Sequence, residues 1–479
     1  MKRARQTAIT GIAIGAAVWI VGCASAVQSG ADVQGGIDTR LLGKDVKVHA
    51  TLAGPAEDGG QKRREPTGEL SRSEALDLVL LHNPELRSFS WDIRIAAARK
   101  LQAGLWPNPE LEIEVEDIGG TGERSGFDGA ETTVVISQPI ELGDKRAKRV
   151  HLADAHSRLA EWDYEAKRLE VYAQVSKSFS RVLAAQERVR LAETQVELAE
   201  KLSLAVAKRV EAGKDSPVEK TKAQIELSNS RIELTKASAE LEVAKRQLAS
   251  LWAADKPEFA KATGQLDDIV EPGSYETLRE LTLKHPSVAR WDDEVAAGKA
   301  ASVLADAQRF PDISVVGGLK RFEEANENTV VLGLAIPLPV FDRNQAGRLE
   351  ATYALAKARE LVSQARSQTL ARLAEAHGRL VDAGHQASIL RGEILPNAEQ
   401  VFNATLTGYE QGKFDYLTML DSQRTLFDVR QRAVAALLEY HQARADVESL
   451  IGQRLPVADE DYLSNAAQKP LLQESTDER

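Results

Sequence analysis

The residues of this chain that could do chemistry are few and scattered. Among its 479 residues are eight histidines and a single cysteine, Cys23. His151 and His156 are five residues apart and His377 and His385 are eight apart, whereas a helix offers two ligands to one metal ion at a spacing of four. A lone cysteine supports neither a disulfide framework nor a zinc–thiolate site. Because no nucleophile stands with a base and an orienting group, we predict no enzyme, no cofactor and no stable metal site.

The clearest chemical pattern is an alternation of acidic and apolar residues over 110–116. A period of two predicts a strand with one apolar and one charged face. If the apolar face meets lipid, Glu112, Glu114 and Glu116 line a water-filled lumen, where clustered carboxylates raise the local concentration of cations. The alternative is an edge strand of a soluble sheet, whose charges merely face water.

This strand belongs to a predicted β-hairpin that occurs twice in the chain. The four strands are expected at about residues 109–118, 131–140, 311–320 and 329–338. Pro139 matches Pro337 and Asp144 matches Asp342, at a separation near two hundred residues, so the chain is an internal duplication. We place the first copy at residues 73–256, a linker at 257–274 and the second copy at 275–453.

A very long helix is predicted after each hairpin. The stretch from Asp144 to Ala212 contains neither proline nor glycine, and as one helix it would extend about 100 Å. The second stretch, Asp342 to Gln411, is expected to kink at Pro396. Helices of this length need partners along their whole length, as in a bundle or coiled coil.

Tight turns with matching capping residues end both long helices. Gly213 and Gly412 suit C-terminal caps, Ser216 and Asp415 suit N-caps, and Glu219 suits the acid of a capping box. We therefore expect each long helix to turn and return, the first to about residue 252 and the second to about residue 452.

The beginning of the chain has the plan of an export signal. Residues 1–22 combine a basic start, a long apolar run and a small residue before Cys23. The preceding Ile-Val-Gly resembles a bacterial lipobox, in which the cysteine is lipidated; an ordinary signal cut at residues 24–26 is the alternative. Residues 23–72 are expected to be a lipidated, flexible tether and residues 454–479 a polar tail.

Charge and hydropathy narrow the class of protein. The chain has 61 basic and 72 acidic residues, a net charge of -11. Loss of the three basic residues in the export signal would make the net charge -14, which argues against nucleic acid as a partner. No later apolar run reaches the roughly 18 residues of a spanning helix, so only strands could cross a membrane.

The order of these parts resembles the TolC-like outer-membrane efflux proteins. Ser-Gln-Pro-Ile-Glu-Leu-Gly-Asp-Lys-Arg at 137–146 and Ile-Pro-Leu-Pro-Val-Phe-Asp-Arg-Asn-Gln at 336–345 are closest to the branch that serves heavy-metal exporters of the resistance-nodulation-division type. The resemblance covers about residues 73–452. It implies a mainly α fold with a membrane β-barrel: a homotrimer in which four strands per chain form a twelve-stranded barrel in the outer membrane, above a periplasmic tunnel of helices.

The resemblance also implies a function and partners. The trimer would passively conduct substrates, in this branch heavy-metal cations, from a periplasmic adaptor and an inner-membrane pump to the exterior. The helical tips that dock on the adaptor correspond to Gly213 with Lys214 and Gly412 with Lys413, although plain glycine caps are the alternative. A periplasmic coiled-coil lipoprotein, acting as a scaffold or adaptor without a pore, is the alternative function.

Two further expectations come from matching positions. In the family's best known members, two acidic residues in the places of Thr418 and Asp421 ring the closed aperture, so this chain would keep one acidic ring and neutralise the other. Leu417 and Leu420 would then pack on the helices; alternatively, Asp421 is a solvated carboxylate without a role. Trp106 is expected at the membrane interface, where aromatic rings are enriched, or else in a core at a helix end.

Overall fold

The computed structural model describes residues 65–122 and 125–455, all of which belong to one compact unit. The predicted export signal, Cys23 and most of the predicted tether lie outside the described residues, as does the tail after residue 455. Those predictions are therefore not addressed by the structure.

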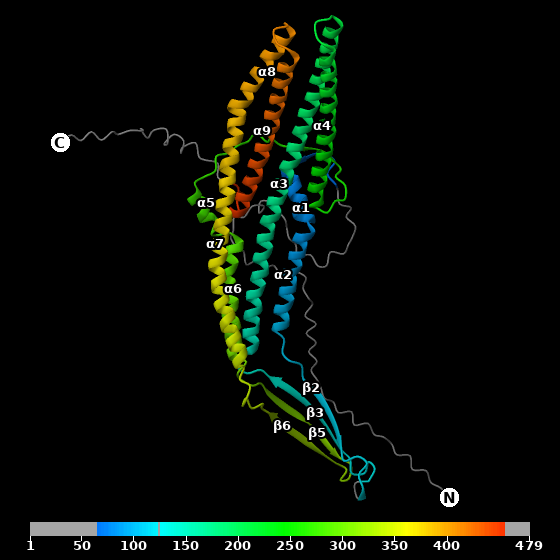
Figure 1. The fold of residues 1–479 in the computed structure, drawn as a ribbon. Helices are drawn as coiled ribbons and strands as arrows, with labels where there is room; N and C mark the ends of the chain where they lie inside the picture. Colours follow the sequence, from blue (N-terminus) through cyan, green and yellow to red (C-terminus); the bar gives the residue numbers. More distant parts are fainter. Residues whose placement is uncertain (1–64, 123–124, 456–479) are drawn as a thin grey trace, which may run out of the picture. The chain divides into compact units, whose positions relative to one another are not determined.

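The described chain contains two similar series of elements (Figure 1). The first series is α1 (Arg72–His82), α2 (Pro84–Ala103), β2 (Glu110–Glu116), β3 (Glu131–Ile140), α3 (Lys145–Glu211) and α4 (Pro217–Ser250). The second is α5 (Tyr275–Thr282), α6 (Pro286–Ala307), β5 (Ile313–Phe322), β6 (Glu327–Ala335), α7 (Gln345–Ile389), the π-helical turn η2 (Leu390–Ile394), α8 (Leu395–Glu410) and α9 (Tyr416–Ile451). Each series places one β-hairpin between helices.

The first residue of each long helix follows a residue in the left-handed region. Asp144 precedes α3 with a φ of 55° and Asn344 precedes α7 with a φ of 54°. Asp and Asn adopt this conformation more readily than other non-glycine residues. The structural equivalent of Asp144 is therefore Asn344, two residues beyond the Asp342 that the sequence comparison paired with it.

The helices form two layers that share α3 and the continuous run of α7, η2 and α8. Along its first half α3 packs against α2 and α6, and α6 packs against α7; along its second half α3 packs against α4 and α9, and α9 packs against both α7 and α8. The orders are thus α2–α3–α6–α7 next to the sheet and α4–α3–α9–α8 toward the far turns (Figure 1). Within the described part of the chain, no helix is both long and apolar enough to span a membrane.

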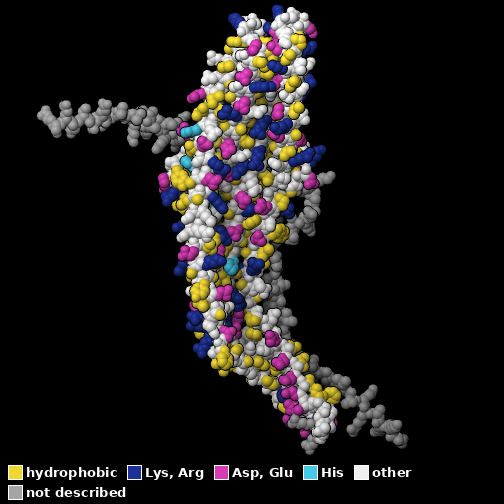
Figure 2. Space-filling model, in the orientation of Figure 1, with side chains coloured by type: hydrophobic (Ala, Val, Ile, Leu, Met, Phe, Trp, Pro, Cys, Tyr) yellow, Lys and Arg dark blue, Asp and Glu magenta, His cyan; other side chains and the backbone are white. Residues whose placement is uncertain are grey.

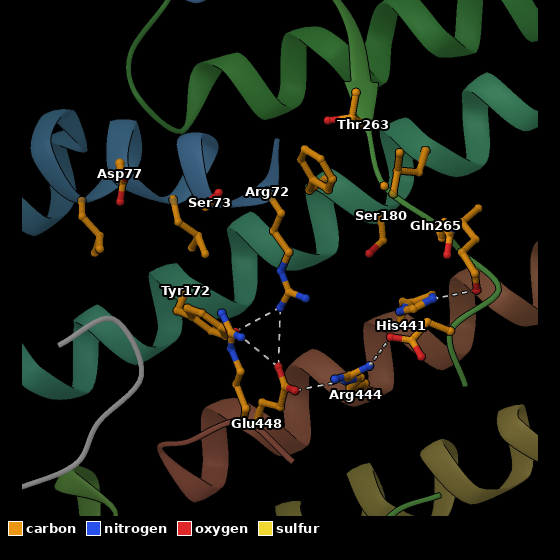
Figure 3. A pocket seen from close by; sticks show the side chains of 18 of the residues that line it. Arg72, Ser73, Asp77, Tyr172, Ser180, Thr263, Gln265, His441, Arg444 and Glu448 are labelled. Atoms are coloured by element: carbon orange, nitrogen blue, oxygen red, sulfur yellow. Dashed lines mark hydrogen bonds and ion pairs between the residues drawn. The ribbon is translucent and has the colours of Figure 1, made fainter. Parts of the chain in front are cut away.

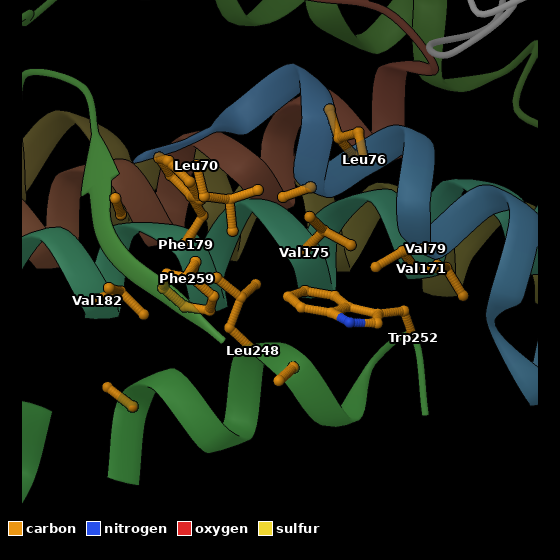
Figure 4. Packing of buried hydrophobic residues seen from close by; sticks show 14 of the residues in the cluster. Leu70, Leu76, Val79, Val171, Val175, Phe179, Val182, Leu248, Trp252 and Phe259 are labelled. Atoms are coloured by element: carbon orange, nitrogen blue, oxygen red, sulfur yellow. The ribbon is translucent and has the colours of Figure 1, made fainter. Parts of the chain in front are cut away.

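The hydrophobic core beside α1 explains why a long helix is stable there. Val171, Val175, Phe179 and Val182 recur at spacings of three and four on α3, and all are at most 2% exposed. They pack with residues from α1 and α4 and around Trp252 in one cluster (Figure 4). Burying apolar surface contributes roughly 25 cal/mol of free energy per Å². Packing of this kind therefore stabilises a helix that would be only marginally stable alone.

Two short strands, β1 and β4, lie in the regions that were predicted to be a flexible tether and a linker. β1 (Gly68–Ser71) pairs in parallel with β4 (Phe259–Thr263), so the prediction that residues up to 72 form a flexible tether is wrong for its last residues. Leu70 and Phe259 are buried in the cluster around Trp252. The strands escaped notice because they have four and five residues, too few to show a period of two.

The break expected at Pro396 takes the form of a π-helical turn. η2 ends just before α8, and the N–H of Leu395 bonds to the carbonyl of Leu390, five residues back. Proline has no N–H for the carbonyl four residues earlier. A π-helical turn is one way for a long helix to accommodate that loss.

The four hairpin strands form one antiparallel sheet in the order β2-β3-β5-β6. β3 and β5 lie in the centre, so the two copies join through their inner strands. β2 and β6 are the outer strands, and within the described residues neither has a partner on its outer side. The sheet therefore presents two open edges, one from each copy.

Candidate functional site

The register of the sheet places the predicted lumen residues on one face. Residues paired directly across antiparallel strands project to the same side, and Glu112 pairs with Val135, Glu114 with Thr133 and Glu116 with Glu131. All three glutamates are exposed. Acidic side chains gather along the sheet in Figure 2.

The opposite face of the sheet is apolar and exposed. Leu332 on β6 is 82% exposed, and Leu111, in the same row of the sheet on β2, is 65% exposed. Every large hydrophobic side chain that is exposed within these four strands lies on this face: Leu111, Ile113, Val115, Val134, Ile136, Ile140, Val315, Leu319, Val330, Leu332 and Leu334. An apolar patch of this extent marks a surface that meets lipid or another protein.

The face of the sheet that carries Glu112, Glu114 and Glu116, called the acidic face from here on, also carries Lys320. The sequence did not predict a lysine at this place. Its Nζ lies 3.2 Å from a carboxylate oxygen of Glu116 and 2.5 Å from one of Glu131. Glu112 and Glu114 form no ion pair within the described residues. Lys320 lies 204 residues from Glu116 along the chain, so their contact could have been predicted only from the register in which the strands pair.

Exposed apolar residues continue where the sheet meets the helices. Trp106 is 59% exposed, and the guanidinium of Arg146 lies 4.1 Å from the centre of its ring. After β6, Leu338 is 78% and Phe341 is 92% exposed. The expectation that Trp106 is an interface residue stays a prediction, but its exposure does not fit a core position.

The two far turns have the same backbone geometry. Gly213 (φ +68°) and Gly412 (φ +74°) adopt the left-handed conformation, and the N–H groups of Lys214 and Lys413 bond to the carbonyls of Arg209 and Gly408. This is the Schellman arrangement that ends a helix. Both lysines are exposed, so the turns can contact a partner.

The capping residues after these turns are mostly as predicted. Asp415 accepts a hydrogen bond from the N–H of Thr418 at 2.9 Å. The side chain of Thr418, and then this N–H, hold the pKa of the Asp415 carboxyl below its usual range. Ser216 accepts from the N–H of Val218, one residue short of Glu219. The predicted capping box with Glu219 is not formed, and burial raises the pKa of that carboxyl.

An arginine, an aspartate and a tyrosine join the two turns. Arg209 donates two hydrogen bonds to Asp215, at 2.8 and 2.9 Å, and Tyr409 donates its hydroxyl to the same carboxylate at 2.9 Å. The bonds from Arg209 hold the pKa of Asp215 low, while burial raises the pKa of Tyr409. Sequence reasoning missed the link between the turns because Asp215 and Tyr409 lie 194 residues apart.

Thr418 and Asp421 lie on one exposed strip of α9. Leu420 is buried among the helices as expected, but Leu417 is 48% exposed, so the expectation that Leu417 packs on the helices is wrong. The strip that carries Asp421 is available to a partner or a pore.

The histidines have structural roles where they are buried. His285 caps α6 by accepting the N–H of Ser287, and burial lowers its pKa to about 4. His441 donates to the carbonyl of Leu266 at 2.8 Å, and burial lowers its pKa too. In residues 65–122 and 125–455, no three His, Cys, Asp or Glu side chains are grouped to hold a metal ion.

A cavity of about 770 Å³ lies where the two copies meet at mid-length (Figure 3). Arg72 and Tyr172 reach it from the first copy and Arg444 and Glu448 from the second. Glu448, only 1% exposed, accepts from Arg444 at 3.0 Å and from the Tyr172 hydroxyl at 3.4 Å, and lies 3.5 Å from Arg72. These polar contacts link the two structural repeats of the chain at the cavity.

Comparisons with known proteins agree with this geometry. The family model for the outer membrane efflux protein matches residues 75–254 and 277–453. The cobalt-zinc-cadmium resistance protein CzcC of Cupriavidus metallidurans is 37% identical over 390 residues, covering 81% of this chain and 92% of CzcC.

Solved structures share the fold. The structure of CusC superimposes with a TM-score of 0.68 at 17% identity, over 80% of this chain and 92% of CusC. The open state of the MtrE outer membrane channel of Neisseria gonorrhoeae gives a TM-score of 0.67 at 18% identity, over 80% and 89% of the two chains. The predicted TolC-like fold is confirmed, and the chain belongs to the outer membrane efflux protein family.

Proposed function

We propose that three copies of this chain close into a channel through the outer membrane that passively conducts heavy-metal cations out of the periplasm. The observation that carries the proposal is the sheet, which has one apolar face, one acidic face and two open edges. Lipid does not tolerate open strand edges, whereas a closed barrel has none.

The number of copies is the one that the TolC-like resemblance implies, and it fits the width that the strands can enclose. Two copies would supply eight strands, and an eight-stranded barrel has an interior just wide enough to be filled by its side chains. Three copies supply twelve strands and leave room for a lumen. With the apolar face toward lipid, Glu112, Glu114 and Glu116 line that lumen, the last of them balanced by Lys320.

The choice of substrate and partners rests on relatives. CzcC is named for resistance to cobalt, zinc and cadmium, and its match spans most of both chains. We infer that this protein serves a similar system, taking cations from a periplasmic adaptor and an inner-membrane pump of the resistance-nodulation-division type. The exposed turns at Gly213, Lys214, Gly412 and Lys413 are the proposed docking points for the adaptor.

The decisive experiment is to purify the protein in detergent, measure its mass and add it to a planar bilayer. A trimer that forms stable, cation-selective channels is the expected result. A monomer without conductance would contradict the proposal and favour a scaffold without a pore.

We propose that Asp421 forms an acidic ring at the far end of the channel, beside a neutral ring of Thr418. Three carboxylates held close together bind a multivalent cation that partly blocks the resting channel. Single-channel current with divalent or trivalent cation on the periplasmic side should show weaker block in Asp421→Ala than in wild type. Asp428→Ala, two turns away, is the matched control, and equal block in all three proteins would remove Asp421 from the gate.

We also propose that Cys23 carries the lipid that anchors the chain in the outer membrane. The proposal rests on the lipobox-like sequence before Cys23. Mass spectrometry should find a lipidated Cys23 at the N-terminus, and Cys23→Ser should leave the precursor unprocessed. An unmodified N-terminus beyond Cys23 would refute the anchor.

A further inference from the structure

The exposed apolar surface of the sheet continues into the segments that connect the sheet to the helices. After β6 the apolar series goes on at every second residue with Ile336, Leu338 and Val340, which are 49%, 78% and 61% exposed. At and just after the end of α2, Leu101 and Leu105 are 73% and 57% exposed. The apolar surface therefore reaches the junction between the sheet and the helices.

Three exposed aromatic side chains lie at this junction. Trp106 follows α2, Phe310 follows α6 and Phe341 precedes α7, and they are 59%, 45% and 92% exposed. Figure 2 shows hydrophobic side chains gathered where the sheet meets the helices. Exposed aromatic rings at the end of an apolar surface are typical of the boundary between a membrane and water.

Two of the three rings have an arginine over them. The guanidinium of Arg146, in the first turn of α3, lies 4.1 Å from the centre of the Trp106 ring, and that of Arg309 lies 4.7 Å from the centre of the Phe310 ring. A guanidinium in this position is attracted by the face of the ring and keeps N–H groups free for other hydrogen bonds.

The third ring, that of Phe341, is followed two residues later by Arg343. The Nε of Arg343 donates to the carbonyl of Pro339 at 3.0 Å. Within the described residues, none of the three arginines of the junction forms an ion pair with a carboxylate. Their guanidinium groups therefore have hydrogen-bond donors and positive charge available to a ligand.

This lack of carboxylate partners sets the three arginines apart from the basic side chains around them. Neighbours in sequence are paired with acids: Lys145 with Asp312, Arg149 with Glu141 and Arg348 with Asp306. The whole chain is acidic, with a net charge of -11. Unpaired positive charge at the end of the apolar surface is thus a local feature, and it is complementary to an anion at the same depth.

A phospholipid carries the complementary groups in the matching order. Its acyl chains suit the apolar surface, its glycerol region suits the aromatic rings, and its phosphate suits guanidinium groups, which bind phosphate through two parallel N–H bonds. In phosphatidylethanolamine an ammonium group of the same headgroup accompanies the phosphate. Phosphatidylglycerol has no such cation, so the unpaired arginines favour the anionic lipid.

We propose that Arg146, Arg309 and Arg343 bind the headgroup phosphates of anionic phospholipids in the periplasmic leaflet of the outer membrane. The inference rests on the insertion of the sheet into that membrane under the proposed function. To the interface position expected for Trp106, it adds the class of lipid and the residues that recognise it.

Native mass spectrometry of the full-length protein, solubilised in detergent and freed of lipid, tests the site. The protein is offered phosphatidylglycerol or phosphatidylethanolamine at equal concentration, and the bound lipid is counted. An arginine beside an anionic headgroup strengthens binding about fivefold, so the wild type should prefer phosphatidylglycerol by at least about that factor. Combining Arg146→Gln, Arg309→Gln and Arg343→Gln should bring the ratio of the two lipids close to one.

The matched control combines Arg181→Gln, Arg359→Gln and Arg366→Gln, which remove three charges from exposed positions on α3 and α7. Arg359 is fourteen residues from the start of α7, about 21 Å along the helix, and the other two lie further from the starts of their helices. The control should keep the wild-type ratio. If the triple variant of the junction does not fold, the exposed Arg309 is changed alone, and Arg309→Gln should lower the ratio by up to about fivefold.

The outcomes separate the lipid site from the function. A wild type that forms channels but binds the two lipids equally would overturn the lipid site alone. A variant of the junction that keeps the wild-type ratio, or a control that loses it, would do the same. A protein that forms no channels in planar bilayers of either lipid would overturn the proposed insertion and the lipid site with it.

Discussion

The carboxylates of the acidic face differ in how freely they can act on a passing ion. Glu112 and Glu114 have no ion pair in the described part of the chain, whereas Glu116 and Glu131 share Lys320. An unpaired carboxylate attracts cations, while a paired one is largely neutralised by its partner.

Selectivity should move in opposite directions when these groups are changed. Replacing Glu112, Glu114 and Glu116 by Gln should lower the preference for cations over anions at low salt, and Lys320→Gln should raise it. Reversal potentials in a salt gradient measure both, and the effects should shrink as ionic strength rises. Unchanged potentials in both variants would show that this face does not line the pore.

Asp215 should make the far turns sensitive to acid. Its pKa is lowered chiefly by the bonds from Arg209, so its stabilising contribution is complete above the unfolded pKa of about 3.9 and is lost as pH falls through the lower folded value. At pH 7, Asp215→Asn should destabilise the turn by about 1 to 3 kcal/mol.

Hydrogen–deuterium exchange of the turn amides measures this effect, with labelling times scaled for intrinsic exchange. Exchange in Asp215→Asn should exceed wild type at pH 7 and approach it near pH 3. Glu211→Gln, at an exposed position in the same turn, is the control. Equal exchange in wild type and Asp215→Asn at pH 7 would mean that the Arg209–Asp215–Tyr409 cluster does not hold the turns.

What could be predicted at the residue scale depended on distance along the chain. Gly213, Gly412 and Asp415 were recognisable because a cap acts on residues within one helical turn. Lys320 and Tyr409 were not, since each lies about two hundred residues from a carboxylate that it contacts. Glu219 failed as a capping-box acid because Ser216 bonds to Val218 instead.

Among the elements, the central pair of strands depends on one close approach of two backbones. A Cβ on Gly318 would lie 2.1 Å from the carbonyl oxygen of Val134 and 2.6 Å from the Cα of Val135. β5 could therefore not keep its register against β3 with a larger residue at this position.

Gly318→Ala should reduce the yield of folded, closed channels, at a cost of about 1 to 3 kcal/mol from overpacking. Gly317→Ala is the matched control, because its Cβ would meet only a Leu332 methyl at 3.9 Å. Heat-resistant trimer on unboiled gels gives the readout. Equal yields for the two variants would contradict the register described here.

Long elements were predictable and short ones were not. The long helices could be predicted from the length of the proline-free stretches and from the spacing of apolar residues on α3. The hairpins could be predicted from the alternation of apolar and acidic residues and from the internal duplication. β1 and β4 depend on burial against Trp252 from a distant part of the chain, which no local pattern records. At Pro396 the missing N–H predicted a break in the helix, but it did not predict that the break takes the form of a π-helical turn.

At the scale of the whole molecule, Glu448 links the two structural repeats of the chain. Its carboxylate contacts Arg72 and Tyr172 of the first copy and Arg444 of the second. Glu448→Ala would leave the largely buried Arg444 without its main partner, and breaking a buried pair in this way costs about 3 to 5 kcal/mol.

The melting temperature of the detergent-solubilised protein should therefore fall in Glu448→Ala. Glu439→Ala removes an exposed carboxylate from the same helix and should leave the melting temperature close to that of wild type. If both variants melt alike, the joint between the copies does not depend on this network.

The exposed apolar face of the sheet has a consequence for the order of events in folding. The hairpins α3–α4 and α8–α9 are made of contacts close in sequence and can form quickly. A sheet completed in water would expose Leu332 and its neighbours and offer two free edges to other strands, both of which promote aggregation. Under the proposed closure of three copies, we therefore expect productive folding to build the helices early and to finish the strands last, when neighbouring chains and lipid are at hand.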